Sequence, residues 1–276
     1  MLKHRVLTAL VLIPIVIWGI FQLSTFPAFA TVLGLFVVLG VLEWTRLIHI
    51  SDSVQRMSYV AVLVACLLAS LVVMQSGFWF AMLLLASVAW WAVQLSQLSN
   101  YDGSHRDSSG FAIADLWAGI ALLVPTWAAL VFIHQHTEHG SGLVLFLMIL
   151  IWTADSGAYF VGRKFGKNKL APLISPGKSK EGAYGALAAS GIVSLIGAFW
   201  LELDFFQFIF FLLLCQLVVI FSIGGDLLES VYKRRAGVKD SGTLLPGHGG
   251  VLDRIDSMMA ASPLFALGIW LLGIIE

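Results

Sequence analysis

Charged side chains are scarce in this sequence: Asp, Glu, Lys and Arg make up only 12% of its 276 residues, where about a quarter is usual in soluble proteins. Hydrophobic residues account for 59%, and the mean hydropathy is +0.92. A soluble domain of this size could not hide so much apolar surface. The composition therefore excludes an ordinary soluble fold and makes lipid the solvent for most of the chain.

Cysteine and net charge are also nearly absent. The two cysteines, Cys66 and Cys215, stand alone in apolar runs, so they have no metal-ligand spacing and are best interpreted as small buried hydrophobic residues. The formal net charge is zero, which gives no reason to expect a nucleic-acid partner. The Walker A pattern G-x-x-x-x-G-K-[ST] does not occur, which excludes a P-loop nucleotide site.

Long apolar runs are abundant, and about 20 such residues suffice to cross a bilayer. The predicted fold is an all-α, polytopic integral membrane protein with a single transmembrane domain over residues 1–276. We expect about nine spans, at residues 6–24, 26–43, 58–75, 78–98, 113–133, 143–162, 183–201, 205–228 and 257–275. Two connecting turns, STFP and LELD, are so short that this count could shift by one or two.

The first 30 residues also carry features of a cleaved signal peptide: a basic start, an apolar stretch and an A-x-A pattern at Ala28 to Ala30. The apolar stretch is long, however, and a second one follows almost at once. We therefore interpret residues 6–24 as a retained first span and keep cleavage as the alternative.

The basic residues indicate an orientation. With nine spans, all 16 lysines and arginines fall in alternate flanking segments, and the opposite segments hold only acidic, histidine and neutral residues. Because cytoplasmic loops are enriched in Lys and Arg, we expect a cytoplasmic N-terminus and an outside C-terminus. The two long polar segments, 163–182 and 229–256, are then cytoplasmic loops. We expect the spans within 1–135 to be mainly scaffold and 143–276 to be the catalytic half.

Carboxylates gather at the cytoplasmic ends of the eighth and ninth spans. Asp226 and Glu229 are three residues apart, as are Asp253 and Asp256, so each pair shares a helical face. A carboxylate at the membrane boundary is costly unless it is paired or binds a cation, and its oxygens suit Mg²⁺. We therefore predict that Mg²⁺ is held by Asp226, Asp253 and Asp256. Ordinary salt bridges to Arg254 and the nearby lysines are the alternative.

A basic run and a glycine-rich stretch lie between these acidic pairs. Lys233 to Arg235 and Lys239 precede SGTLLPGHGG, whose glycine amides can approach phosphate oxygens ahead of a helix N-terminus. Together with Mg²⁺, these groups predict a triphosphate site. The alternative for the basic run is an anchor at the cytoplasmic membrane surface.

A second phosphate-binding candidate lies in residues 163–182. The SPGKS stretch combines a rigid turn with Lys178, Ser179 and Lys180, which suits a phosphate group. Nearby, Asp155 lies about two helical turns inside the sixth span, where a carboxylate needs a partner. A buried helix–helix hydrogen bond is the alternative to a functional role for Asp155.

Taken together, these stretches resemble the signature of the bacterial phosphatidate cytidylyltransferases, also called CDP-diacylglycerol synthases. The signature runs S-x-x-K-R, four residues, K-D, a short spacer and P-G-H-G-G-x-x-D-R-x-D. It matches Ser230, Lys233, Arg234, Lys239, Asp240, Pro246, Gly247, His248, Gly249, Gly250, Asp253, Arg254 and Asp256. DSGAY, KLAP-x-x-SPGK and the MLK-x-R start also match, so the resemblance covers essentially the whole chain. Tyr232 departs from the pattern, because an aliphatic residue or Phe is expected there.

The resemblance implies a Mg²⁺-dependent nucleotidyltransferase of phospholipid biosynthesis in the cell inner membrane. Its substrates would be CTP and phosphatidic acid, and its products CDP-diacylglycerol and pyrophosphate, at the cytoplasmic side. The lipid phosphate is already anionic, so bringing two anions together matters more than a strong general base. The resemblance also suggests a homodimer, and it leaves a second cation open.

Residue roles follow from this reaction as hypotheses. The predicted catalytic set is Lys239, Asp240, His248 and Arg254. Within it, Lys239 and Arg254 contact the nucleotide phosphates, Asp240 orients Lys239, and His248 bonds a phosphate, orients a metal ligand or is structural. The predicted substrate-binding set is Lys178, Ser179, Lys180, Lys233, Arg234, Gly249 and Gly250. The first three of these would receive the phosphatidate headgroup, and the glycine amides would contact the nucleotide.

Two other classes of protein are alternatives. A CDP-alcohol phosphotransferase also uses aspartates and a divalent metal at the membrane boundary, but its D-G-x-x-A-R opening is absent. A transporter needs charges deep in the membrane, ideally in two related halves. Only Asp155 lies well inside an expected span, and no internal repeat is evident.

Overall fold

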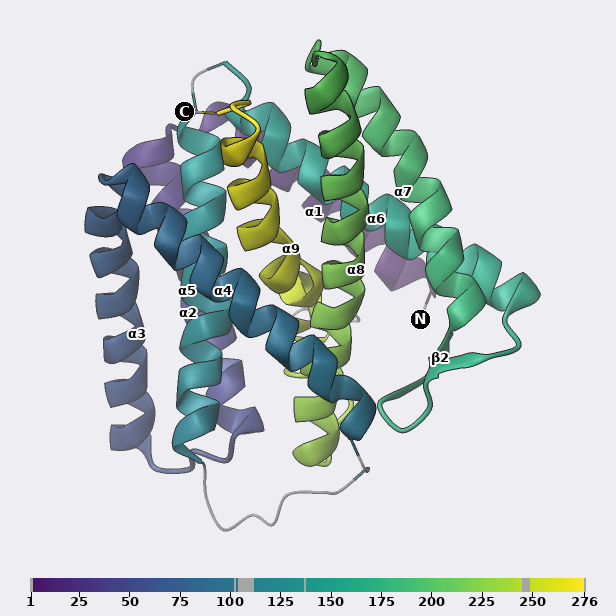
Figure 1. Ribbon diagram of the computed structural model, residues 1–276. Coiled ribbons are helices and arrows are strands. Elements are labelled where there is room, and N and C mark those ends of the chain that lie inside the picture. The colour runs from purple at the N-terminus through teal and green to yellow at the C-terminus, as the bar shows by residue number, and fades with distance from the viewer. Residues whose placement is uncertain (1, 102, 104–111, 137, 245–248, 276) are drawn as a thin grey trace.

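The computed structural model describes residues 2–101, 103, 112–136, 138–244 and 249–275. Within these ranges the chain forms a bundle made almost entirely of helices (Figure 1). The α-helices are α1 (Leu2–Gln22), α2 (Ala30–Leu47), α3 (Ser53–Met74), α4 (Gly77–Gln97), α5 (Ile113–Gln135), α6 (Gly140–Phe165), α7 (Lys180–Trp200), α8 (Phe205–Arg235) and α9 (Leu252–Leu271). A π-helical turn, η1 (Thr25–Phe29), leads into α2, and a 3-10 turn, η2 (Leu98–Asn100), follows α4.

Seven helical segments in the described ranges are long and apolar enough to cross a membrane: Thr25–Leu47, Ser53–Met74, Gly77–Asn100, Ile113–Gln135, Gly140–Phe165, Lys180–Trp200 and Phe205–Arg235. They confirm an all-α polytopic membrane protein and correspond to seven of the nine expected spans. The first expected span contributes the shorter apolar stretch Ile13–Gln22 of α1. The ninth lies in α9, whose first turns carry Asp253, Arg254 and Asp256 and are therefore more polar.

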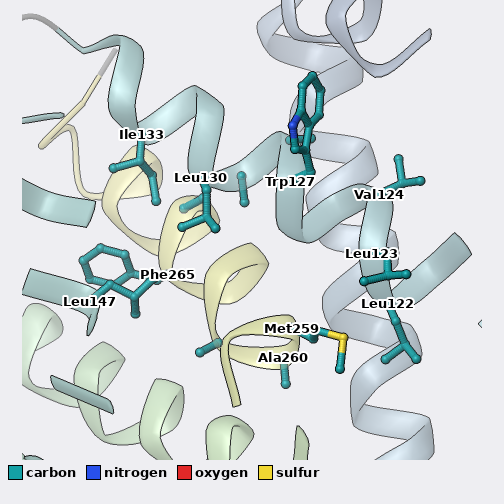
Figure 2. Packing of buried hydrophobic residues seen from close by; sticks show 14 of the residues in the cluster. Leu122, Leu123, Val124, Trp127, Leu130, Ile133, Leu147, Met259, Ala260 and Phe265 are labelled. Atoms are coloured by element: carbon teal, nitrogen blue, oxygen red, sulfur yellow. The ribbon is translucent and has the colours of Figure 1, made fainter. Parts of the chain in front are cut away.

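The centre of the bundle is formed by α5 and α9. Nearly all of α5 from Leu122 to His134 is buried, as is much of α9, and Figure 2 shows the apolar side chains of both helices in this core. Thr126 of α5 donates a hydrogen bond to the carbonyl oxygen of Met259 in α9 at 3.1 Å. Because lipid is as apolar as these side chains, close packing and such hydrogen bonds hold the helices together.

The outer helices expose apolar side chains, as a lipid environment requires. More than half of the surface of each of the following residues is exposed: Leu68 and Val72 of α3, and Ile196 and Phe199 of α7. In water, apolar faces of this extent would favour aggregation. Their exposure agrees with helices that face lipid acyl chains.

Two glycines allow α6 and α7 to approach backbone to backbone. A side chain on Gly157 of α6 would collide with the carbonyl oxygen of Gly185 in α7, and a side chain on Gly185 would collide with that of Gly157. Small residues permit such contacts between membrane helices. The start of α7 is therefore held beside the part of α6 that contains Asp155.

The polar segment 163–182, expected to be a loop, contains a β-hairpin. Its strands, β1 (Lys169–Ala171) and β2 (Ser175–Ser179), are antiparallel. Ile174 in the turn packs against Leu227 and Val231 of α8. This small apolar cluster seats the hairpin on the end of α8 and fixes the position of Lys178 in β2.

The polar segment 229–256 is also more regular than expected, because α8 continues to Arg235. Side chains four residues apart support this extension, since Lys233 forms an ion pair with Glu229 at 2.7 Å. Figure 1 shows β2 and the C-terminal end of α8 at the same end of the bundle, opposite the C-terminus of the chain. Both polar segments therefore contribute to one end of the molecule.

Candidate active site

Two cavities adjoin each other at this end of the bundle, and Asp155 and Asp226 line both. The more polar cavity has a volume of about 350 Å³ and is lined by Asp155, Asp226, Ser230, Lys233, Arg234, Lys239, Asp240, Asp253, Arg254, Asp256 and Ser257. The other has a volume of about 400 Å³ and is lined by Asp155, Ala158, Tyr159, Gly162, Arg163, Leu170, Gly177, Lys178, Ser179, Gly182, Ala183, Ile223 and Asp226.

The residues predicted from the sequence divide between the two cavities. The polar cavity collects the three predicted metal ligands together with Lys233, Arg234, Lys239, Asp240 and Arg254. The second cavity collects Lys178 and Ser179. Lys180 is exposed on the first turn of α7, and Gly249 and Gly250 are not among the lining residues of either cavity. The prediction for His248 lies outside the described residues.

Lys233 joins α8 to the first turn of α9. Its Nζ donates to Glu229 Oε2 and to Asp253 Oδ1, each at 2.7 Å. Lys233 and Glu229 are both buried, and burying charges is tolerated only when they are closely paired. The ammonium group of Lys233, which was predicted to bind substrate, therefore binds two carboxylates of the protein itself.

Asp253 holds the loop that joins α8 to α9. Its Oδ1 accepts from Lys233, and its Oδ2 accepts from the amides of Ser241 at 2.9 Å and Gly250 at 2.8 Å. Burial alone would raise the pKa of Asp253, but the hydrogen bonds from Lys233 and Gly250 outweigh it and lower the pKa. Asp253 is thus an anion with both oxygens occupied, and the Gly250 amide points to Asp253 rather than to an open phosphate site.

Asp256 is brought towards Asp226 by a glycine contact between α8 and α9. A side chain on Gly225 would collide with the carbonyl oxygen of Asp256, so only glycine lets the two helices meet this closely. Burial and the neighbouring charge of Asp226 raise the pKa of Asp256. Carboxylates crowded in this way are stabilised by a bound cation.

Asp226 itself is paired with Lys178 from β2. The Nζ of Lys178 lies 2.7 Å from Asp226 Oδ2, and the Ser230 hydroxyl donates to Asp226 Oδ1 at 3.3 Å. About a quarter to a third of the two charged side chains is exposed, at 26% and 31%. Solvent screening keeps such a pair weak, so an arriving ligand can replace either partner.

The acidic groups of the polar cavity differ in whether they are placed to hold a metal ion. In the ranges that the structure describes, no group of three or more His, Cys, Asp or Glu side chains is placed to hold a metal ion. Asp226 and Asp256 nevertheless line one cavity, and Mg²⁺ is commonly bound by one or two carboxylates together with substrate phosphates. These two residues therefore fit Mg²⁺ that arrives with a nucleotide, whereas Asp253 is already occupied.

Two residues predicted to bind substrate also make structural hydrogen bonds. Arg234 Nε donates to the carbonyl oxygen of Ile174 at 3.3 Å, which fastens the β-hairpin to α8. The Ser179 hydroxyl accepts from the amide of Gly182 at 3.1 Å and caps the N-terminus of α7. Both side chains shape the cavities, whatever else they contact.

Glu43, about one turn before the C-terminal end of α2, was not predicted from the sequence as a site residue. Its side chain is only 1% exposed. Its Oε1 accepts from the amide of Val251 at 3.0 Å, and its Oε2 accepts from the amide of Leu252 at 2.9 Å and the hydroxyl of Ser241 at 3.0 Å. The signal in the sequence was an acidic residue at the end of the expected span 26–43, where an unpaired carboxylate is costly.

Comparison with known proteins agrees with the signature in the loop. Residues 3–272 match the cytidylyltransferase family. The phosphatidate cytidylyltransferase of Pseudomonas aeruginosa is 44% identical over 273 residues, which cover 99% of this chain and 98% of that protein. Its counterpart from Haemophilus influenzae is 38% identical over 282 residues, 96% of this chain and 98% of that protein. These matches confirm the resemblance, and the chain belongs to the cytidylyltransferase family.

Proposed function

We propose that this protein is a phosphatidate cytidylyltransferase that makes CDP-diacylglycerol for phospholipid biosynthesis. A phosphate oxygen of phosphatidic acid attacks the α-phosphorus of CTP. The bond from the α-phosphorus to the oxygen that bridges to the β-phosphate breaks, and pyrophosphate leaves. The relatives with this name, which match over nearly the whole chain, support the proposal.

The observation that carries the proposal is that two acidic residues, Asp155 and Asp226, line both of two adjoining cavities. The polar cavity, with Lys239 and Arg254, suits the phosphate groups of a nucleoside triphosphate. The adjoining cavity combines Lys178 and Arg163 with apolar groups such as Leu170, which suits a phosphate attached to a lipid. Reacting phosphates from the two sides would meet at Asp155 and Asp226, and this juxtaposition provides the proximity that the transfer requires.

Within the polar cavity, Lys239 and Arg254 neutralise the nucleotide phosphates, and Asp240 orients Lys239. We also assign the amides of Gly249 and Gly250 to these phosphates, but neither glycine lines a cavity, and the Gly250 amide would first have to leave Asp253. Positive groups at the α-phosphate and at the departing pyrophosphate stabilise charge that develops in the transition state. The three alternative roles of His248 stay predictions.

In the second cavity, Lys178 would leave Asp226 and pair with the phosphate of phosphatidic acid. This exchange is inexpensive because the Lys178–Asp226 pair is partly exposed. Ser179 holds the start of α7 in place, and the exposed Lys180 offers a further contact for the headgroup at the surface. The acyl chains would remain in the bilayer.

Mg²⁺ is the cofactor that fits the site, with Asp226 and Asp256 as its protein ligands. When bound, Mg²⁺ would reduce the negative charge of the triphosphate and align it for displacement. The sequence also named Asp253 as a ligand, but its hydrogen bonds to Lys233, Ser241 and Gly250 suit a positioning role.

We place the protein in the cell inner membrane with both cavities facing the cytoplasm. The support is the distribution of basic residues, since cytoplasmic loops are enriched in Lys and Arg, and CTP is a cytoplasmic nucleotide. The homodimer is proposed from the family resemblance alone. Light scattering of the protein–detergent complex would test it.

The test is pyrophosphate release by the purified protein in detergent micelles that contain phosphatidic acid. CTP is compared with ATP, GTP and UTP, each with Mg²⁺ and with EDTA. We expect release only when CTP, phosphatidic acid and Mg²⁺ are all present. A folded protein that releases no pyrophosphate under these conditions, or releases it without phosphatidic acid, would overturn the proposal.

A further inference from the structure

Glu43 connects the N-terminal half of the chain to the loop of the polar cavity. It follows the apolar stretch of α2, yet its carboxylate is almost completely buried, at 1% exposed. Among the residues that the structure describes, its hydrogen-bond partners are Ser241, Val251 and Leu252, which lie 198 to 209 residues later in the sequence. Burying a carboxylate is costly unless it is well bonded, so this position has a specific structural purpose.

The carboxylate of Glu43 takes the place of the missing cap of α9. Val251, the residue at the N-cap position, provides no capping side chain, so the first amides of the helix need another acceptor. Glu43 accepts from the amides of Val251 and Leu252, and a negative group is favoured at a helix N-terminus. The donors from Ser241, Val251 and Leu252 are neutral, so these hydrogen bonds fix geometry without cancelling a positive charge.

The loop is held from two sides. Glu43 binds the Ser241 hydroxyl, while Asp253 binds the amides of Ser241 and Gly250. The loop also approaches Glu43 closely at two described positions, because a side chain on Gly242 or Gly250 would collide with the Glu43 carboxylate. The sequence motif thus needs glycine at 250 for contact with Glu43.

The segments held by Glu43 carry two of the cationic groups of the polar cavity, Lys239 and Arg254. Lys239 and Asp240 directly precede Ser241, and Arg254 lies two residues after Leu252. Their backbone positions are therefore set by the bonds that end on Glu43. Displacement of a catalytic group by about 1 Å can cost about 100-fold in rate.

We infer that Glu43 is a positioning residue for nucleotide binding: it acts through Ser241, Val251 and Leu252 to aim Lys239 and Arg254 at the triphosphate. This inference rests on the proposed function, because it takes the ligand of the polar cavity to be CTP. Glu43 lines neither cavity, so it is not expected to touch either substrate.

Glu43→Gln is the sharpest test. The side chain keeps its size, but either orientation of the new amide places an NH₂ group against the N–H of Val251 or Leu252. We expect a KM for CTP raised by about tenfold and a KM for phosphatidic acid within about twofold of the wild-type value. Hydrogen exchange at the amides of Val251 and Leu252 should become faster.

Asp52→Asn is the matched control. Asp52 caps α3 by accepting from the amide of Gln55 at 3.0 Å, at the surface and outside both cavity linings. It therefore tests the loss of a capping negative charge at a helix N-terminus without displacing the loop, and both KM values should match the wild type. If Glu43→Gln fails to fold, Ser241→Ala removes one of the three donors and should still raise the KM for CTP selectively.

The outcomes separate this inference from the proposed function. If the wild-type protein releases no pyrophosphate from CTP and phosphatidic acid, the proposed function fails. If the wild type is active and Glu43→Gln keeps the wild-type KM for CTP, the inference about Glu43 is wrong. A Glu43→Gln protein whose two KM values rise together, in step with a lower melting temperature, would show a merely structural role and would also overturn it.

Discussion

The ammonium group of Lys233 lies 2.7 Å from a carboxylate oxygen of Glu229 on its own helix and 2.7 Å from one of Asp253 on the next. This bridge connects the end of α8 with the first turn of α9. Both helices carry proposed metal ligands, Asp226 and Asp256. The geometry of the site therefore depends on a lysine that is not free to bind substrate.

Lys233→Met should destabilise the fold by about 3–5 kcal/mol, because it leaves Glu229 buried without its cation. Thermal unfolding in detergent would measure the change. Arg235→Met is the control: the guanidinium carbon of Arg235 lies 5.9 Å from the ring centroid of Tyr101 and 5.8 Å from that of Tyr232, and the loss of these cation–π contacts should cost only about 1 kcal/mol. Equal melting temperatures for Lys233→Met and the wild type would contradict the role of the bridge.

Gly225→Ala should separate α8 from α9 at the place where the proposed metal ligands meet. The added methyl group would collide with the carbonyl oxygen of Asp256, which cannot move without shifting α9. We expect kcat/KM to fall by about 100-fold, as is typical of a displacement of about 1 Å. Gly77→Ala, where an added methyl group meets nothing within 4 Å, should retain wild-type activity. A fully active Gly225→Ala protein would show that the helices can adjust.

The sequence predicted the helices well and the roles of the polar residues less well. Apolar runs predict seven of the spans directly, because a helix that crosses the bilayer needs about 20 mostly apolar residues. The hairpin at Lys169–Ser179 and the extension of α8 to Arg235 escaped prediction, because both depend on tertiary contacts: Ile174 packing on α8, and the ion pair of Lys233.

The aspartates show why the site was harder to predict than the fold. An aspartate that binds a metal ion and an aspartate that accepts hydrogen bonds from backbone amides look identical in a sequence. Asp253 and Asp256 are three residues apart, but in the fold Asp253 accepts from Lys233, Ser241 and Gly250, whereas Asp256 lies near Asp226. Glu43 was overlooked because its partners lie about 200 residues away. The division into an N-terminal scaffold and a C-terminal catalytic half stays a prediction.

Lys178→Met should weaken the binding of phosphatidic acid more than that of CTP. Lys178 lines the less polar cavity and reaches Asp226 at its boundary. We expect the KM for phosphatidic acid to rise by about tenfold and the KM for CTP to change by about twofold or less. Steady-state kinetics in mixed micelles would measure both constants. The exposed Lys167, outside the cavity linings, gives the control Lys167→Met, and an equal effect of both variants would point to general surface charge instead.

The proposed orientation predicts which end of the bundle a membrane-impermeant thiol reagent reaches. Cys66 and Cys215 are first replaced by alanine, and single cysteines are introduced at exposed Thr243, in the loop before α9, or exposed Gln75, between α3 and α4. Thr243→Cys should react in inverted inner-membrane vesicles and Gln75→Cys in spheroplasts. The reverse pattern would place both cavities outside the cytoplasm and rule out the proposed use of CTP there.

Three aspartate-to-asparagine variants distinguish metal ligands from positioning residues. Asp226→Asn and Asp256→Asn should each raise the Mg²⁺ concentration for half-maximal activity by about tenfold or more, because each removes an anionic oxygen ligand from a site with few others. Asp253→Asn should instead lower the melting temperature, since its new NH₂ group must face Lys233 or a backbone N–H. Its activity should fall without a comparable change in the Mg²⁺ requirement. Titrations of Mg²⁺ alongside thermal unfolding would measure both properties in each variant. If Asp253→Asn shifted the Mg²⁺ curve as far as Asp256→Asn, all three aspartates would be ligands, and the hydrogen bonds around Asp253 would have to rearrange when the metal binds.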